Sequence, residues 1–263
     1  MDVLSPRSLD EALRLKSERP DAVPICGGTD LMVELNFDRR RPEAILNLAE
    51  VPELRGWSQD NGTLRLGSAL TYTEVMSSLA GVLPALAEAS RTVGSPQIRN
   101  RGTIGGNLGT ASPAGDALPP LLIEGAEIEL ASVRGVRRLP LSEFLVGPKR
   151  NALASDELIA AAVVSPSGAP QTFMKVGPRN AMVIAVCSLA VCADRERGEL
   201  RAAFGSAGPV PGLVTVSLEE SESFPERVAA AASPIDDVRG TAAYRRHALA
   251  VLAARGLDRC LAA

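Results

Sequence analysis

The sequence predicts an α+β protein, and three patterns along the chain support this prediction. Residues 22–26 read as a short buried strand that runs into a glycine turn at residues 27–30, with the start of a helix behind it. Residues 99–116 are rich in glycine, hydroxyl and amide side chains. After residue 170, strand-like segments come first and helix-like segments follow, which is typical of a layered α+β domain.

The bulk composition is that of an ordinary globular protein. The chain has 263 residues, is 46% hydrophobic and carries a formal net charge of −3, so it can bury a substantial core and has no electrostatic footprint for nucleic acid. The first residues contain no apolar signal-peptide region, and the longest uncharged apolar run, residues 181–193, is shorter than the roughly 18 residues that suggest a membrane span. We therefore expect a cytoplasmic protein without nucleic-acid partners and without a membrane span.

The first 54 residues predict a small α/β unit built on the first glycine turn. Ser8 and Glu11 form a capping-box pattern, which starts a helix that runs to about Arg19. A strand is expected at residues 44–48 and a turn at residues 51–54.

The next part of the chain predicts helices and strands around the glycine-rich stretch. Thr71 and Glu74 form a second capping-box pattern, and another helix starts at residue 83. Alternating side chains predict strands at residues 63–67, 127–130 and 157–164. The segment that follows, residues 165–170, contains serine, proline and glycine and is the best linker in the chain.

This linker marks the expected domain boundary. We expect a first domain over residues 1–168, with subdomains of about 1–54 and 55–168, and a second domain over residues 169–263. The second domain is expected to contain strands at 172–176, 182–192, 200–204 and 214–218, and helices near 225–232 and 241–255.

The glycine-rich stretch has the composition of an anion-binding loop. Residues 99–116 contain five glycines, two threonines and two asparagines, and glycine allows a ligand to touch backbone amides that can hold phosphate oxygens. Taken alone, the stretch could equally be a long surface loop. The glycine turn at residues 27–30 favours the binding hypothesis, because two such turns suit a dinucleotide whose pyrophosphate lies between them.

These motifs also carry a family resemblance. The sequences PICGGTDL at residues 24–31, TIGGN at 103–107 and TASPAGD at 110–116 resemble the FAD-binding subunit of molybdenum hydroxylases, of the xanthine dehydrogenase type. The resemblance runs over essentially the whole chain. It implies the two-subdomain FAD-binding fold of vanillyl-alcohol-oxidase-like flavoproteins, followed by a small α+β C-terminal domain.

The resemblance implies a set of cofactor-binding residues in both glycine turns and beyond them. They are Pro24, Ile25, Cys26, Gly27, Gly28, Thr29, Asp30, Leu31, Thr103, Ile104, Gly105, Gly106, Asn107, Thr110, Asp116, Ile159 and Lys175. In this reading a side chain added at Gly105 would enter the space where the backbone meets the pyrophosphate. Asp116 would accept a hydrogen bond from an FAD hydroxyl, Ile159 would contribute a backbone contact, and Lys175 would lie near the flavin.

Three of these residues have simpler interpretations that remain open. Asp116 precedes an apolar segment and could cap a helix, and capping is the favoured role of the Asp30 side chain. Lys175 lies in a strand-like segment and could be an exposed edge residue.

The sequence offers no catalytic or metal-binding set of its own. The four cysteines, Cys26, Cys187, Cys192 and Cys260, are scattered, and His247 is the only histidine. No G-x-G and no Gly-Lys pair occurs, which argues against a Rossmann fingerprint and a P-loop. The chemistry is therefore expected from FAD, bound without a covalent bond because neither glycine turn contains a histidine.

The resemblance implies an electron-transfer subunit of a larger oxidoreductase. A large molybdopterin-binding subunit and a small subunit with [2Fe-2S] clusters would be the partners, and NAD or another acceptor would take electrons from FAD. Thr29 and Asp30 stand where relatives that oxidise carbon monoxide tend to carry His-Ser, which favours the xanthine type. A carbon monoxide dehydrogenase-like subunit, a stand-alone flavin oxidoreductase and an assembly module without FAD remain alternatives.

Overall fold

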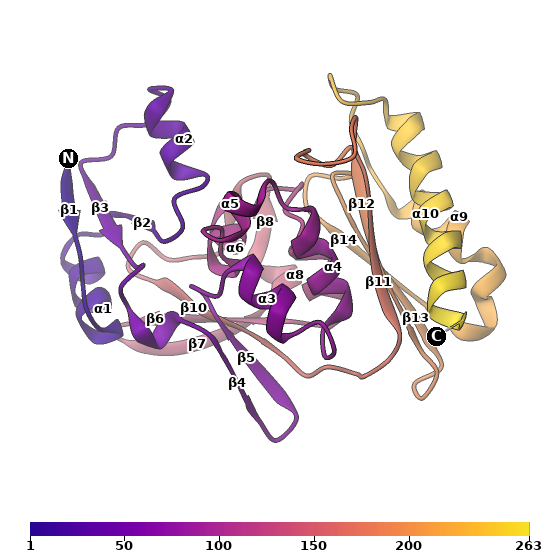
Figure 1. Ribbon diagram of the computed structural model, residues 1–263, viewed down its shortest axis with the longest axis horizontal. Helices are drawn as coiled ribbons and strands as arrows, with labels where there is room; N and C mark the ends of the chain where they lie inside the picture. Colours follow the sequence, from indigo (N-terminus) through magenta and orange to yellow (C-terminus); the bar gives the residue numbers. More distant parts are fainter. Residues whose placement is uncertain (263) are drawn as a thin grey trace.

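Within the described residues, three β-sheets of three or more strands, each with its own helices, lie side by side along the molecule (Figure 1). The computed structural model describes residues 1–262. This mixed architecture confirms the predicted α+β class.

The N-terminal lobe is a parallel three-stranded sheet of order β1-β3-β2. It contains β1 (Asp2–Leu4), α1 (Leu9–Glu18), β2 (Val23–Ile25), α2 (Leu31–Asn36) and β3 (Ala44–Asn47). The Ser8 hydroxyl caps α1 by accepting the Glu11 amide, but the Glu11 carboxylate accepts the Arg7 amide, so only half of the expected capping box forms. The prediction that β2 is buried is wrong, because this strand is an edge that lines a cavity; β3 holds the buried residues.

The middle lobe is an antiparallel sheet of order β4-β5-β10-β6-β7. Its strands are β4 (Trp57–Asp60), β5 (Thr63–Gly67), β6 (Glu127–Ser132), β7 (Gly135–Pro140) and β10 (Leu158–Val164). Its helices are η1 (Pro52–Leu54), α3 (Tyr72–Ser78), α4 (Pro84–Thr92), α5 (Pro96–Arg99), α6 (Ile104–Thr110), α7 (Leu118–Ile123) and α8 (Leu141–Phe144), and the hairpin β8 (Leu145–Gly147) and β9 (Arg150–Asn151) follows α8. The capping box of Thr71 and Glu74 forms in full at the start of α3.

The glycine-rich stretch is not the continuous loop that its composition suggests. Residues 104–110 form the helix α6, although glycine is a poor helix former. The Thr103 hydroxyl caps this helix by accepting the Gly106 amide at 3.0 Å, and Ile104 and Leu108 are fully buried on its inner face. Capping and tertiary packing therefore override the low helix propensity.

The C-terminal lobe is an antiparallel sheet of order β11-β12-β13-β14. It contains β11 (Gln171–Val176), β12 (Cys187–Asp194), β13 (Glu199–Gly205), β14 (Gly212–Ser217), η2 (Leu218–Ser223), α9 (Phe224–Ala231) and α10 (Ala242–Ala262). The helices α9 and α10 cover its outer face, and α4 and α7 of the middle lobe contact it from the other side (Figure 1). The strand expected at 182–192 starts only at Cys187, because Met182 has a left-handed backbone and residues 182–184 line the cavity.

The linker is pinned to the middle lobe. The buried carboxylate of Glu124 accepts the Ser167 amide at 3.3 Å and also binds the side-chain amide of Gln171. Phe173 and Ala190 of the C-terminal sheet belong to the same hydrophobic cluster as Leu86 of α4. The two expected domains thus share a core, and the boundary at residues 165–170 stays a prediction.

Candidate functional site

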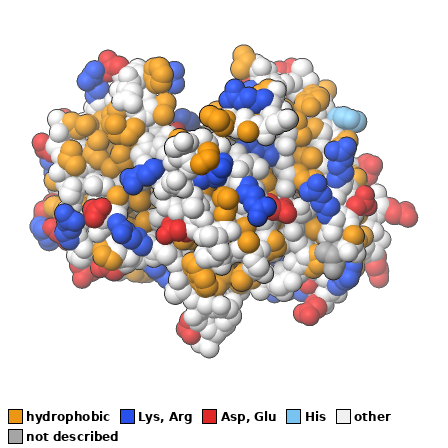
Figure 2. Space-filling view, viewed as in Figure 1, with side chains coloured by type: hydrophobic (Ala, Val, Ile, Leu, Met, Phe, Trp, Pro, Cys, Tyr) orange, Lys and Arg blue, Asp and Glu red, His pale blue; other side chains and the backbone are white. Residues whose placement is uncertain are grey.

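The candidate site is a cavity of about 760 Å³. It lies between the N-terminal lobe, α6 and the segment that joins β11 to β12. Figure 2 shows a hollow at the upper margin of the molecule, between the side that carries α2 and the side that carries the C-terminal sheet. Pockets of this size are typical of sites for organic ligands and cofactors.

The fold brings the two glycine turns together at this cavity. A Cβ atom added to Gly27 would lie 1.9 Å from the backbone oxygen of Arg101, so only glycine permits this approach. The Thr110 hydroxyl donates to the Asp30 carboxylate at 2.9 Å and joins the turns a second time. Asp30 occupies the N-cap position of α2 but makes no side-chain capping bond, so the expected capping role is wrong.

The two turns differ in the backbone amides that they offer. Within residues 1–262, the amides of residues 27–30 donate no hydrogen bond to the protein. By contrast, the Gly105 amide donates to the Ser68 carbonyl at 2.8 Å, and the Gly106 and Asn107 amides donate to Thr103. Consecutive unpaired amides around a residue with positive φ, here Gly28 at +75°, form a concave anion-binding surface. The first turn can therefore bind an anion, whereas the second turn uses these amides for its own structure.

Gly105 is required for packing. A Cβ atom there would lie 2.4 Å from the Ser68 Cβ and 2.6 Å from the Ser68 carbonyl oxygen. A side chain at this position would therefore collide with Ser68, in the segment after β5. The expectation that it would enter the space of the ligand is wrong. Gly105 lines the cavity only with its backbone.

Asp116 and Lys175 form a buried ion pair beside the cavity. The Lys175 Nζ lies 2.6 Å from the Asp116 Oδ2 and also donates to the Thr92 carbonyl at 3.2 Å. Both side chains are about nine-tenths buried or more, so Lys175 is not the exposed edge residue that the strand pattern allowed. Asp116 is not a helix cap, because Ala117 occupies that position in α7. Burial raises the pKa of Asp116, and the Lys175 ammonium group opposes that rise.

Two buried acceptor oxygens at the cavity lack a donor. Asp116 Oδ1 and Asn107 Oδ1 have no hydrogen-bond partner within the described residues, and both residues line the cavity. A buried unpaired polar atom is costly, since it has lost its water without gaining a protein partner. Both oxygens are therefore suited to hydroxyl or N–H donors of a ligand.

Most of the residues expected from the sequence line this cavity. They are residues 24–31, Thr103, Gly105, Gly106, Asn107, Thr110, Asp116 and Ile159. Ile104 does not, because its side chain is fully buried in the core, and Lys175 reaches the cavity only through Asp116.

Sequence reasoning missed several lining residues. Arg40, Lys149 and Glu157 line the cavity, as does the segment Met182 to Ile184. Arg40 lies in a run of three arginines that reads as a solvated surface, and the apolar pattern predicts a strand at residues 182–184. The Gly147-Pro148 turn before Lys149 is a loop signal that could have drawn attention to this position.

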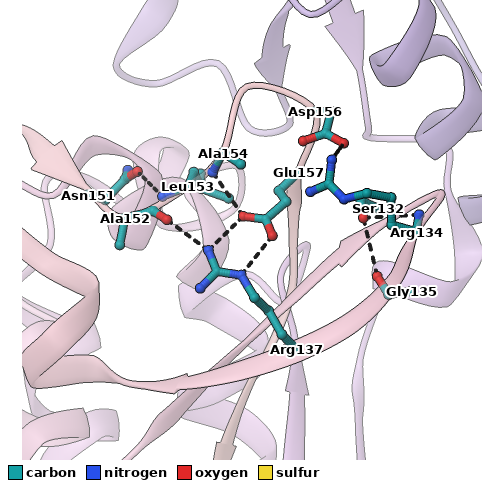
Figure 3. Close-up of polar contacts among 10 residues, drawn as sticks. All are labelled: Ser132, Arg134, Gly135, Arg137, Asn151, Ala152, Leu153, Ala154, Asp156 and Glu157. Atoms are coloured by element: carbon teal, nitrogen blue, oxygen red, sulfur yellow. Dashed lines mark hydrogen bonds and ion pairs between the residues drawn. The ribbon is translucent and has the colours of Figure 1, made fainter.

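An ion pair fixes the wall formed by residues 151–159. The buried Glu157 carboxylate receives two hydrogen bonds from the Arg137 guanidinium, at 2.7 and 2.8 Å, and one from the Ala154 amide at 2.8 Å (Figure 3). Arg137 also donates to the Ala152 carbonyl at 2.9 Å. The Arg137 guanidinium holds the pKa of Glu157 below its usual value. Because its two oxygens accept hydrogen bonds from Arg137, Glu157 is an ionised structural residue and not a proton donor.

The described residues contain no metal-binding cluster and no activated thiol. Among them, no three histidine, cysteine, aspartate or glutamate side chains come together as a metal site. Cys26 lines the cavity, but burial raises the pKa of its thiol. No helix within residues 1–262 has the length and apolar character to cross a membrane.

Comparison with known proteins identifies the class. Residues 1–166 match the family described as the FAD binding domain in molybdopterin dehydrogenase, and the chain belongs to this family. It is accordingly an FAD-binding oxidoreductase subunit of the molybdenum hydroxylase type, which confirms the resemblance seen in the sequence.

Individual relatives cover nearly the whole chain. The putative xanthine dehydrogenase FAD-binding subunit of Escherichia coli strain K12 is 31% identical over 275 residues, which cover 97% of this chain and 94% of the relative. The nicotine 6-hydroxylase medium subunit of Paenarthrobacter nicotinovorans is 33% identical and covers 92% of this chain and 90% of its own length. A chain of carbon monoxide dehydrogenase from Hydrogenophaga pseudoflava superposes with a TM-score of 0.92 at 25% identity, covering 100% of this chain and 97% of that chain.

Proposed function

We propose that this chain holds FAD in the cavity between the glycine turns and passes electrons from [2Fe-2S] clusters on a partner subunit to NAD or another acceptor. The observation that carries this proposal is the combination of unpaired amides at residues 27–30 with the unpaired oxygens of Asn107 and Asp116. Amides suit a diphosphate, and acceptor oxygens suit the hydroxyl groups of a ribityl or ribose unit. When bound, FAD supplies the redox chemistry that the side chains lack.

The residues of the cavity divide into two roles. Gly27, Gly28 and Thr29 would hold the diphosphate through their amides, with Thr103, Gly106 and Thr110 shaping the opposite wall. Asp116 would accept from a ligand hydroxyl, and Ile159 would contribute a backbone contact at the wall that Glu157 supports. Lys175 would act through Asp116, by holding its other oxygen.

Two observations support the proposed partners: the family of the chain, and the lack of a metal-binding cluster within the described residues. We infer a large molybdopterin-binding subunit and a small [2Fe-2S] subunit, because no metal-binding group occurs within residues 1–262 and relatives are named as subunits of larger enzymes. We place this assembly in the cytoplasm.

The xanthine dehydrogenase type is the version that we favour. The relative named for it is similar over nearly the full chain, and Thr29 and Asp30 stand where carbon monoxide-oxidising relatives tend to carry His-Ser. A carbon monoxide dehydrogenase-like subunit is the second candidate, supported by the superposition with the Hydrogenophaga pseudoflava enzyme. A stand-alone flavin oxidoreductase is disfavoured because the cavity carboxylates of Asp116 and Glu157 are both engaged in ion pairs.

Two measurements test this function. The purified chain should show a flavin absorbance spectrum, and acid precipitation should release the yellow flavin into the supernatant. A colourless chain that does not bind added FAD would refute FAD binding, and flavin retained in the acid pellet would refute non-covalent attachment.

Purification from the native cell tests the electron route. We expect molybdenum and [2Fe-2S] subunits to be recovered with this chain, and xanthine-dependent dye reduction to require them. Recovery of the chain alone with that activity intact would contradict the subunit assignment.

A further inference from the structure

Arg40 and Lys149 are the only cationic residues among those of the described chain that line the cavity. They stand at its rim on different parts of the fold, Arg40 after α2 and Lys149 in the turn between β8 and β9. The other lining charges are the carboxylates of Asp30, Glu34, Asp116 and Glu157.

Two of these carboxylates are neutralised from behind the cavity wall. Asp116 is paired with Lys175 at 2.6 Å, and Glu157 is paired with Arg137 at 2.7 Å. Positive charge that a cavity ligand can reach therefore resides in Arg40 and Lys149.

Glu34 links the two cations only loosely. Its carboxylate oxygens lie 3.6 Å from the Arg40 Nη1 and 3.8 Å from the Lys149 Nζ. Hydrogen bonds between such groups are shorter, about 2.7–3.2 Å, so the N–H groups of both cations remain available to another anion.

The turn that carries Lys149 is held in place at some conformational cost. Lys149 adopts a left-handed backbone with φ of +54°, which is uncommon for a residue other than glycine. Its amide donates to the Ala111 carbonyl at 3.0 Å, and the Asn151 side chain donates to the Gly109 carbonyl at 2.9 Å. Both anchors lie at the end of α6, so the backbone of the turn that carries Lys149 is fixed relative to the second glycine turn.

We propose that Arg40 and Lys149 form a two-sided cationic rim that binds the phosphate groups of a dinucleotide in this cavity. This deepens the proposed function and rests on it. The shared chemistry is a nucleotide diphosphate, and its source is either the FAD held by this chain or a nicotinamide dinucleotide that approaches FAD. Glu34 is the internal competitor, because its carboxylate attracts the same two cations.

The test is a double variant, Arg40→Gln with Lys149→Gln, made in the full chain. FAD, ADP and riboflavin are titrated into the flavin-free protein, and the Michaelis constant for NADH-dependent dye reduction is measured after FAD loading. Loss of two charge-assisted contacts should weaken FAD and ADP binding by about tenfold or more, with riboflavin binding unchanged and a weaker dependence on salt.

A control variant, Arg14→Gln with Arg227→Gln, removes the same charge from exposed ion pairs away from the cavity. Glu34→Gln should change affinity in the opposite direction, towards tighter ADP binding. Thermal melting of each variant establishes that it folds.

The outcomes separate the two ligand sources and the two proposals. Weaker FAD binding assigns the rim to the resident cofactor, whereas normal FAD binding with a raised Michaelis constant for NADH assigns it to the acceptor. If the FAD affinity, the ADP affinity and the Michaelis constant for NADH all equal those of the control variant, the proposed cationic rim is refuted. A wild-type chain that binds ADP at the rim but not FAD would instead refute the proposed function.

Discussion

At the scale of single residues, Asp116 links the core to the cavity. One of its carboxylate oxygens binds Lys175, and the other is buried without a donor in a residue that lines the cavity. Lys175 lies 59 residues away in the sequence, so no local pattern could have paired them. The family resemblance names both residues as cofactor-binding, but only the fold shows that Lys175 forms an ion pair with Asp116.

The first prediction concerns this pair. Lys175→Met should lower the free energy of unfolding by about 3–5 kcal/mol, because it leaves a buried carboxylate without its counter-charge. The double variant with Asp116→Asn should recover part of this loss, and urea unfolding of the four proteins measures the coupling. Equal stability of Lys175→Met and wild type would show that the pair contributes nothing to the fold.

The second prediction compares two glycines of the same helix. Gly105→Ala should destabilise the protein by about 1–3 kcal/mol, because the new Cβ would press on Ser68. At Gly109 the nearest atom to a new Cβ would be the Ile159 Cδ1 at 3.7 Å, an ordinary contact, so Gly109→Ala should be neutral or stabilising. Thermal melting decides between them, and equal effects would argue against the packing role of Gly105.

At the scale of elements, the sequence predicted the helices and strands whose capping residues or strand-type side chains agree with the structure that they form. Helices α1 and α3 have capping residues, and β5 and β10 have the residue types of strands, so their approximate positions were correct. The strands β4 and β7 were missed because nearly all of their residues are exposed and no alternation appears. Helix α6 was missed because the packing of Ile104 and Leu108 outweighs its glycine content.

The third prediction concerns the wall held by Arg137 and Glu157. Because the Arg137 hydrogen bonds lower the pKa of Glu157 in the folded protein, this carboxylate stabilises the fold fully above its ordinary value of 4.5. The stabilisation should disappear as the pH falls from 4.5 through the lowered folded value. Glu157→Gln should be less stable at pH 7 and lose less stability on acidification, as melting temperatures between pH 3 and pH 7 would show. Parallel acid profiles for the variant and wild type would contradict this assignment.

At the scale of the whole molecule, the C-terminal sheet shares a hydrophobic core with the first expected domain. Helices α4 and α7 lie between the middle and C-terminal sheets, and Phe173 and Ala203 of the C-terminal sheet join the main hydrophobic cluster. The composition of residues 165–170 predicted a linker between two domains. Ser167 and Gln171 bind Glu124, which lies more than 40 residues earlier, so no local sequence pattern could reveal these contacts.

The fourth prediction follows from this shared core. A fragment of residues 1–168 should expose the apolar faces of α4 and α7, bind the dye ANS and unfold without a cooperative transition, since these faces lose their partner sheet. The full chain should bind little ANS and unfold cooperatively. A fragment that melts as sharply as the full chain would show that the first domain is independently stable.

The segment Met182 to Ile184 lines the same cavity as the glycine turn at residues 27–30. During synthesis the turn leaves the ribosome early, whereas the opposite wall emerges only after most of the chain has been made. A nascent chain can therefore display the turn to solvent but cannot enclose a ligand against it. A chain truncated before residue 182 lacks this wall of the cavity, and under the proposed function it should bind FAD more weakly than the full chain.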